Sequence, residues 1–188
     1  MRRGMKPITG KRKSAGMTLI ELLIALGIAA VGFSAVMGLF MMAIGNNSRS
    51  KRDSTATLLS QSVLEQIVLA GTNGTATIAL TDCLGNNFTI NTVGGASPGT
   101  GAALTSSGDI DFSQAAPGSN YSMQYTVCRA NGQTAIYDVR WNVLDMDTSG
   151  TTVFTRQVRV AAKPKGTTAA NSFLLPITLR GVAAVAEN

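Results

Sequence analysis

The chain has 188 residues, a formal net charge of +6 and no histidine. Six Lys and Arg residues within positions 1–16 account for the whole excess, because ten basic and ten acidic side chains remain from Met17 onward. This distribution does not favour a nucleic-acid-binding protein, whose basic residues would line the folded surface. The lack of histidine removes the Ser-His-Asp arrangement and the commonest metal ligand. We therefore expect no enzyme, no cofactor and no metal site.

The first predicted element is a membrane-spanning helix at residues 17–45. Apart from Glu21, this stretch carries no charge, and after Glu21 its only polar side chain is Ser34. About 20 apolar residues cross the hydrocarbon core of a bilayer. At about 1.5 Å per residue the segment is longer than that core, so we expect it to tilt or to extend beyond the bilayer. The basic residues before it predict a cytoplasmic amino terminus and an outward-facing remainder.

A secretory signal peptide is the alternative interpretation of this segment. Ala43, Ile44 and Gly45 have the small-x-small spacing of a cleavage site. Signal peptides, however, have apolar regions of roughly 7–15 residues, and Glu21 serves no purpose inside one. A charge near a bilayer centre costs roughly 2.5–3.5 kcal/mol, so Glu21 requires a partner or a function.

The helix is predicted to continue from about residue 18 to about residue 70. Beyond a polar and basic stretch, Leu58, Leu59, Val63 and Ile67 recur at three- and four-residue spacing and predict an apolar stripe. The sequence GTNG at 71–74 supplies a stop signal. The first half of this helix is apolar on all sides, whereas the second half is amphipathic and suited to packing on a domain.

From residue 75 onward the apolar period changes to alternation, which predicts an antiparallel sheet. In the clearest strand, Tyr137, Val139 and Trp141 share one face and Asp138, Arg140 and Asn142 share the other. Asn131-Gly132 predicts a hairpin before it. Residues 94–108 are predicted as a loop and residues 147–150 as a turn, and the stretch 173–185, interrupted by a proline, as an edge strand. The predicted fold class is α+β, a long helix packed on an antiparallel sheet.

Cys83 and Cys128 both follow the apolar segment. If this part of the chain is extracytoplasmic, a disulfide is their expected state. Such a bond would close a loop of about 45 residues and contribute about 3–4 kcal/mol. Two separate buried thiols are the alternative.

Residues 16–21, with the sequence GMTLIE, resemble the processing site of type IV pilins and of the pseudopilins of type II secretion. The resemblance is specific over residues 1–45 and agrees in outline with the fold beyond. It implies cleavage between Gly16 and Met17 by prepilin peptidase and N-methylation of Met17. Thr18 and Glu21 match the family's residue types. Met17 stands where phenylalanine is usual.

The resemblance also implies that Glu21 pairs with the terminal amine of a neighbouring subunit during assembly. A glutamate that merely extends to the lipid headgroups is the alternative. The expected partners are other pilins or minor pilins, contacted through the amino-terminal helix. The implied location is the inner membrane, with a periplasmic carboxy-terminal domain, and then the pilus at the cell surface. The chain is thus expected to comprise a removed leader, a filament-core helix, its amphipathic continuation and a sheet domain, at 1–16, 17–45, 46–71 and 72–188.

Within the superfamily, the cysteine placement and the long Gly/Ser/Thr loops are most similar to minor pilins of the pilus modification protein (PilV) type. A pseudopilin of type II secretion is the alternative. Pseudopilins often bind calcium through clustered acids, for which this sequence offers two pairs, Asp109 with Asp111 and Asp145 with Asp147. A pair in a turn is more often a set of ordinary turn residues. DNA binding would need Arg140, Arg156 and Arg159 on one face, and solvated cross-strand pairs are the favoured interpretation.

Overall fold

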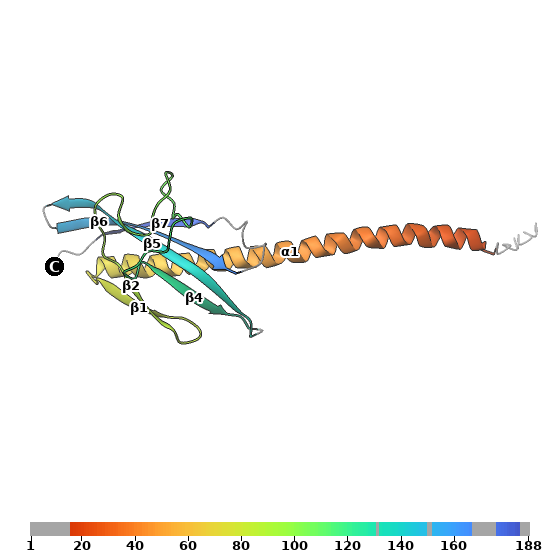
Figure 1. The fold of residues 1–188 in the computed structure, drawn as a ribbon, viewed down its shortest axis with the longest axis horizontal. Coiled ribbons are helices and arrows are strands. Elements are labelled where there is room, and N and C mark those ends of the chain that lie inside the picture. Colours follow the sequence, from red (N-terminus) through yellow and green to blue (C-terminus); the bar gives the residue numbers. More distant parts are fainter. Residues whose placement is uncertain (1–15, 131, 150–151, 167–175, 185–188) are drawn as a thin grey trace, which may run out of the picture. The chain divides into compact units, whose positions relative to one another are not determined.

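The computed structural model describes residues 16–130, 132–149, 152–166 and 176–184, which contain one helix and seven strands (Figure 1). Helix α1 and the strands have the following bounds: α1 Leu19–Thr72, β1 Thr77–Thr81, β2 Asn87–Asn91, β3 Thr100–Gly101, β4 Ser122–Cys128, β5 Thr134–Ser149, β6 Thr152–Lys165 and β7 Thr178–Ala184. All strand pairs are antiparallel, so the predicted α+β class is confirmed. The chain divides into two compact units between Asn46 and Asn47, and each is described separately.

The end of α1 agrees with the predicted stop signal. Gly74 has a φ of 65°, a conformation that glycine adopts without the steric cost of a Cβ. The backbone N–H of Thr75 donates to the carbonyl of Ala70 at 2.9 Å, which satisfies one of the last free carbonyls of the helix. The expected helix and the observed one therefore end within two residues of each other. The leader expected at 1–16 lies outside the described residues except for Gly16.

In the second unit, α1 buries a stripe of mostly small side chains against the sheet. The buried helix residues are Ala56, Ser60, Val63, Ile67, Ala70 and Gly71. The predicted stripe was right for Val63 and Ile67 but wrong for Leu58, which is 67% exposed. Leu58 is two residues from both Ala56 and Ser60, and positions two apart on a helix lie on nearly opposite sides. Small residues allow close approach of the sheet here, and Leu58 points away from it.

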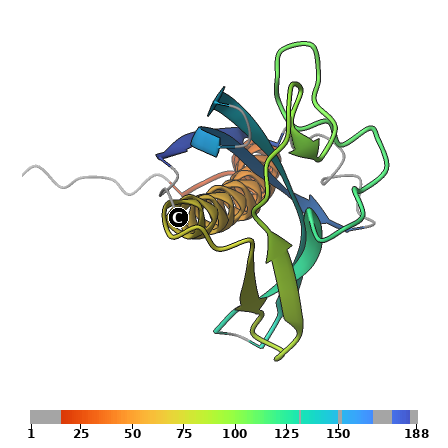
Figure 2. The same cartoon turned by 90° about the vertical axis from the view of Figure 1, so that its left-hand side faces the viewer.

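Strand β5 is the centre of the main sheet, in which the order is β3-β5-β6-β7 and β4 also pairs with β5. The face of this sheet that packs on α1, here called the inner face, carries the predicted alternation. Tyr137, Val139, Trp141 and Val143 are fully buried there, together with β6 side chains such as Val160. Figure 2 shows the last turns of α1 beside this face. Each of these side chains buries most of its apolar surface, a gain of about 1.5–3 kcal/mol per large residue before entropy is counted.

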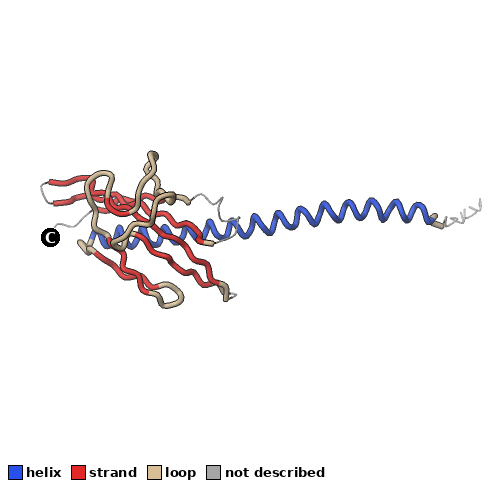
Figure 3. Tube along the Cα trace, viewed as in Figure 1, coloured by secondary structure: helices blue, strands red, loops and turns tan. Residues whose placement is uncertain are grey.

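The opposite face of the sheet, here called the outer face, is covered by the segment between β3 and β4 (Figures 2 and 3). Ala102 and Ile110 of this covering loop are buried against Ala161 of β6 and form a second, smaller core. Asp138, Arg140 and Asn142 do share this face, as predicted. Arg140 and Asn142 nevertheless retain only 7% and 2% of their exposure. Their alternation with apolar residues predicted that they point away from α1, but it could not predict that a loop would cover them.

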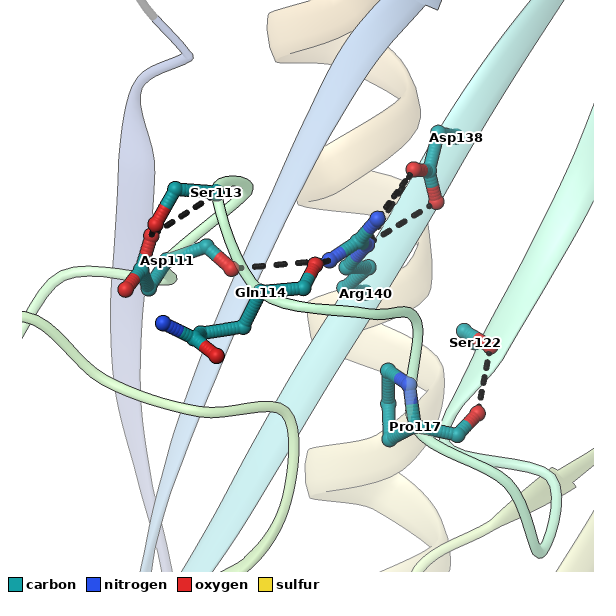
Figure 4. Close-up of polar contacts among 7 residues, drawn as sticks. All are labelled: Asp111, Ser113, Gln114, Pro117, Ser122, Asp138 and Arg140. Atoms are coloured by element: carbon teal, nitrogen blue, oxygen red, sulfur yellow. Dashed lines mark hydrogen bonds and ion pairs between the residues drawn. The ribbon is translucent and has the colours of Figure 1, made fainter.

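Arg140 connects this covering loop to the sheet (Figure 4). Its Nη2 lies 2.8 Å from Oδ2 of Asp138, and its Nη1 donates to the carbonyl of Gln114 at 2.8 Å. The guanidinium also stacks on the ring of Phe112, 4.8 Å from the centroid. These partners replace the water that a buried cation loses, which is the condition for placing arginine in an interior.

Strands β1 and β2 form a separate hairpin that several contacts attach to the rest of the second unit, among them a hydrogen bond and a disulfide. The indole N–H of Trp141 donates to the carbonyl of Asn91 at 2.8 Å. Cys83, in the turn after β1, forms a disulfide with Cys128, the last residue of β4, with a Cα–Cα distance of 5.8 Å. Of the two states that the sequence left open for the cysteines, the structure thus contains the bonded one.

Two predictions about irregular segments were wrong. Residues 94–108 include β3, and Gly95 forms an isolated bridge with Leu144 of β5. This segment lies along the edge of β5 because its glycines permit close approach: a Cβ on Gly101 would lie 2.4 Å from the carbonyl oxygen of Trp141. Residues 147–149 continue β5 instead of starting a turn, and register shifts next to Asp147 accommodate them in the ladder. The predicted edge strand is β7, which ends the described sheet, and residues 173–175 and 185 lie outside the described part.

Candidate functional site

The predicted processing site immediately precedes α1. Gly16, Met17 and Thr18 are exposed, and the helix begins at Leu19. The backbone N–H of Glu21 lies 3.1 Å from the carbonyl of Thr18 and 3.4 Å from its Oγ1. Thr18 is therefore the N-cap of the helix, and Glu21 occupies the third helical position, the spacing of a capping box. Sequence reasoning missed this role of Thr18, although the pattern Thr-x-x-Glu was visible.

Glu21 lies in the first turn of α1 with an exposed side chain. An acid in this position interacts favourably with the partial positive charge at a helix amino terminus, typically by 0.3–1 kcal/mol. Within the part of the chain that the structure describes, no hydrogen bond or ion pair involves its carboxylate. Glu21 lies four residues after Met17, at the start of the helix.

The helix of the first unit exposes apolar side chains on all sides. The large apolar residues between Met17 and Ile44 retain between 47% exposure, at Val36, and 77%, at Leu19. Such a continuous apolar surface marks a membrane or protein interface. By length and composition the helix is able to cross a membrane. Ser34, its one polar residue beyond Glu21, donates its hydroxyl to the carbonyl of Ala30 at 2.9 Å, so it leaves no unsatisfied donor toward lipid.

The arginines considered for DNA binding do not form one surface. Arg140 lies on the outer face, where it is paired with Asp138. Arg156 lies on β6 in register with Asp145, and its Nε is 2.8 Å from Oδ1 of that residue. Arg156 and Arg159 are three residues apart on one strand, so they point to opposite faces. The shared face that phosphate contacts would require is absent among these three residues.

Three of the four acids considered for calcium binding have partners of their own, and the side chain of Asp147 lies outside the described part. Asp145 pairs with Arg156, and Oδ1 of Asp111 accepts hydrogen bonds from the backbone and hydroxyl of Ser113. Asp109 is bound by Arg180 and Ser107. In the described ranges, no group of three or more His, Cys, Asp or Glu side chains is placed to hold a metal ion.

Comparison with protein families identifies the start of the chain. Residues 11–37 match the family model described as the prokaryotic N-terminal methylation motif, a segment that includes Gly16, Met17, Thr18 and Glu21. The match supports the type IV pilin and pseudopilin superfamily, and the helix that carries the motif is long and apolar enough to cross a membrane. Comparisons with curated proteins and with solved structures find no match.

Proposed function

We propose that the chain is a minor type IV pilin, a structural subunit that is processed by prepilin peptidase and then enters or primes a pilus. The observation that carries the proposal is the coincidence of the methylation motif with an exposed apolar helical segment, residues 19–45, whose one acid, Glu21, lies in the first turn. Together they suit a subunit that is stored in the membrane and assembled through its helix.

Cleavage between Gly16 and Met17 has a clear electrostatic consequence. The leader carries six positive charges, which hold the amino terminus in the cytoplasm. Its removal leaves an apolar helix that begins with an amine, followed by the Thr18 cap. In this proposal N-methylation acts on the amine of Met17.

Pairing between subunits gives Glu21 its purpose. A carboxylate and an ammonium are each costly in an apolar surrounding, and the attraction between them offsets part of that cost. Because Glu21 has no partner among the described residues, we propose that it receives the terminal amine of Met17 from a neighbouring subunit. The exposed apolar surface between Met17 and Ile44 is buried by the same contact, which makes the helix both the membrane anchor and the assembly interface.

Two features support a minor pilin of the PilV type over a pseudopilin of type II secretion. The disulfide joins Cys83 to Cys128 and leaves a long segment after it, outside the bonded loop. Of the acids that a calcium-binding pseudopilin would use, Asp145, Asp109 and Asp111 already have Arg156, Arg180 and Ser113 as partners. In the proposed cycle the chain is a single-pass inner-membrane protein with a periplasmic sheet domain, and later a component at the cell surface.

Mass spectrometry of the assembled protein tests the processing step. We expect a mature chain that begins at Met17 and is heavier by one methyl group. A Gly16→Val variant should remain uncleaved and unassembled, whereas Gly10→Val, a matched change within the leader, should be processed normally. An assembled form that keeps its leader, or a mature product that begins near position 46, would refute the proposal.

A double-mutant cycle tests the charge pair. Glu21→Gln and a blocked Met17 amine should each reduce incorporation into filaments, and their combination should cost little more than either alone. Strictly additive losses would show that Glu21 and the amine act independently.

A further inference from the structure

Two arginines face each other across neighbouring strands on the outer face of the sheet. Arg159 of β6 and Arg180 of β7 are register partners, and Arg159 is also opposite Asn142 of β5. Like charges directly opposite each other in an antiparallel pair destabilise a sheet. The arrangement therefore requires compensation, which has to come from nearby groups or from a ligand.

Compensation from the protein reaches mainly Arg180. Its Nη2 lies 3.1 Å from Oδ1 of Asp109 and donates to the carbonyl of Ser107 at 3.0 Å. The hydroxyl of Ser107 donates to the other carboxylate oxygen of Asp109 at 2.9 Å. Hydrogen bonds from Ser107 and Arg180 lower the pKa of Asp109, so this carboxylate is ionised and supplies one negative charge. The charge of Asp109 acts on Arg159 as well as on Arg180.

Arg159 is left with a neutral partner. Its Nη2 donates to the side-chain oxygen of Gln157, and its Nε is buried with no hydrogen-bond partner within the described residues. Burial, followed by repulsion from Arg180, lowers the pKa of Arg159, although Asp109 opposes this effect. An incompletely paired cation with an unsatisfied donor is costly in a half-buried position.

We propose that Arg159 and Arg180 together bind an oxyanion, a phosphate or carboxylate group, beside the tip of the covering loop at Ser107–Asp109. The local excess is one positive charge, because two guanidinium groups face one carboxylate. Guanidinium groups present planar sets of donors that match the oxygens of phosphate and carboxylate. Arg180 is 46% exposed at its side chain, so a ligand can reach the pair from solvent. This site is independent of the amino-terminal helix and of the proposed assembly role.

Thermal unfolding of the full chain in detergent micelles tests the site, with sodium phosphate, sodium acetate and sodium chloride compared at equal ionic strength. At about ten times its Kd, phosphate should raise Tm by about 3 °C over chloride. A comparable rise with acetate would show that the site also accepts carboxylates, and a rise with phosphate alone would assign it to phosphate groups. Equal Tm values in all three salts would overturn the proposal.

Two variants separate the site from general charge effects. Arg159→Gln should abolish the anion-dependent rise, and in chloride its Tm should equal or exceed that of the wild type, because an unpaired desolvated charge is removed. Lys165→Gln removes one positive charge from an exposed position on the same strand and should keep the full rise. Line broadening of phosphate in phosphorus NMR provides a readout that does not depend on stability. A response that survives Arg159→Gln, or that is lost equally in Lys165→Gln, would contradict the proposal.

Discussion

The guanidinium of Arg140 lies 2.8 Å from the carboxylate of Asp138, two residues earlier on the same strand, and a loop covers Arg140 (Figure 4). Residues two apart on a strand share a face, so the pair is local in sequence. The other partners of Arg140 are distant, since Gln114 and Phe112 belong to the covering loop. Arg140 thus makes one contact within its own strand, to Asp138, and others that form only when the covering loop packs on the sheet.

Replacement of Arg140 should destabilise the second unit strongly. In Arg140→Gln, the carboxylate of Asp138 loses its partner, and the carbonyl of Gln114 loses its donor. Breaking a buried pair from one side costs about 3–5 kcal/mol, and the partial exposure of Asp138 reduces this to about 2–3 kcal/mol. Chemical denaturation measures the change. Asp138→Asn, which keeps an acceptor for Arg140, should cost less, and an equal or larger loss there would contradict this account.

The segment that lies along the edge of β5 should not tolerate a side chain at Gly101 of β3. This residue has a φ of 115°, and a Cβ would meet the carbonyl oxygen of Trp141 and the ring of Tyr121. We expect Gly101→Ala to lower the free energy of unfolding by at least about 2 kcal/mol, from backbone strain and the clash together. Gly118→Ala is the matched control, because open space surrounds that position, and its stability should be nearly unchanged. Similar urea midpoints for the two variants would refute the close-approach argument.

Loss of the disulfide should destabilise the attachment of the β1–β2 hairpin. A cross-link over 45 residues restricts the unfolded chain and contributes about 4 kcal/mol in the chain-entropy description. The Cys83→Ala/Cys128→Ala double variant should therefore unfold at a lower denaturant concentration. A reducing agent should shift the wild type toward the variant and leave the variant unchanged. A wild-type midpoint that does not respond to complete reduction would contradict the prediction.

Asp82 should make the domain sensitive to acid. Burial alone would raise the pKa of Asp82, but hydrogen bonds from the side chain and backbone of Asn86 and from the backbone of Leu84 outweigh it and lower the pKa below 3.8. The unfolded chain therefore binds the proton more tightly than the folded one. The resulting stabilisation is complete above pH 3.8 and is lost as the pH falls through the lower, folded-state pKa.

Unfolding curves at several pH values measure this dependence. Asp82→Asn should show a shallower loss of stability on acidification, although Asp109 and Asp111, whose pKa values are also lowered, keep part of it. Glu65→Gln, a matched change at an exposed acid on α1, should retain the wild-type decline. An unchanged acid profile in Asp82→Asn would assign the sensitivity to other groups.

The order of elements was predictable because each depends on local periodicity. The apolar run, the three- and four-residue spacing before GTNG and the alternation from Tyr137 to Val143 correspond to α1 and to the inner face of β5. Leu58 shows where this reasoning fails. Several helical stripes through residues 56–70 satisfy the same spacing, and packing against the sheet selected the one that contains Ala56 and Ser60.

The functional residues also include some that the sequence indicates and some that only the structure brings together. Gly16, Met17, Thr18 and Glu21 could be singled out from the sequence because a short, contiguous motif contains them, and their roles in cleavage, methylation and charge pairing stay predictions. The facing pair Arg159 and Arg180 was not predictable, since 20 residues separate them and only the register of β6 with β7 makes them neighbours. The sequence also predicted an irregular loop at 94–108. Glycine is common in loops, but here it allows the segment to lie close to β5, and the sequence does not distinguish these two uses.

The amino-acid sequence by itself determined the membrane-type helix, its one acid and the antiparallel character of the domain, because these follow from the periodicity of neighbouring residues. The tertiary structure alone decided which helix face is buried, that a loop covers the outer face around Arg140, and that Arg159 and Arg180 oppose each other. These features depend on strand register and on contacts between residues that are far apart in the sequence. The pattern of neighbouring side chains does not determine either of them.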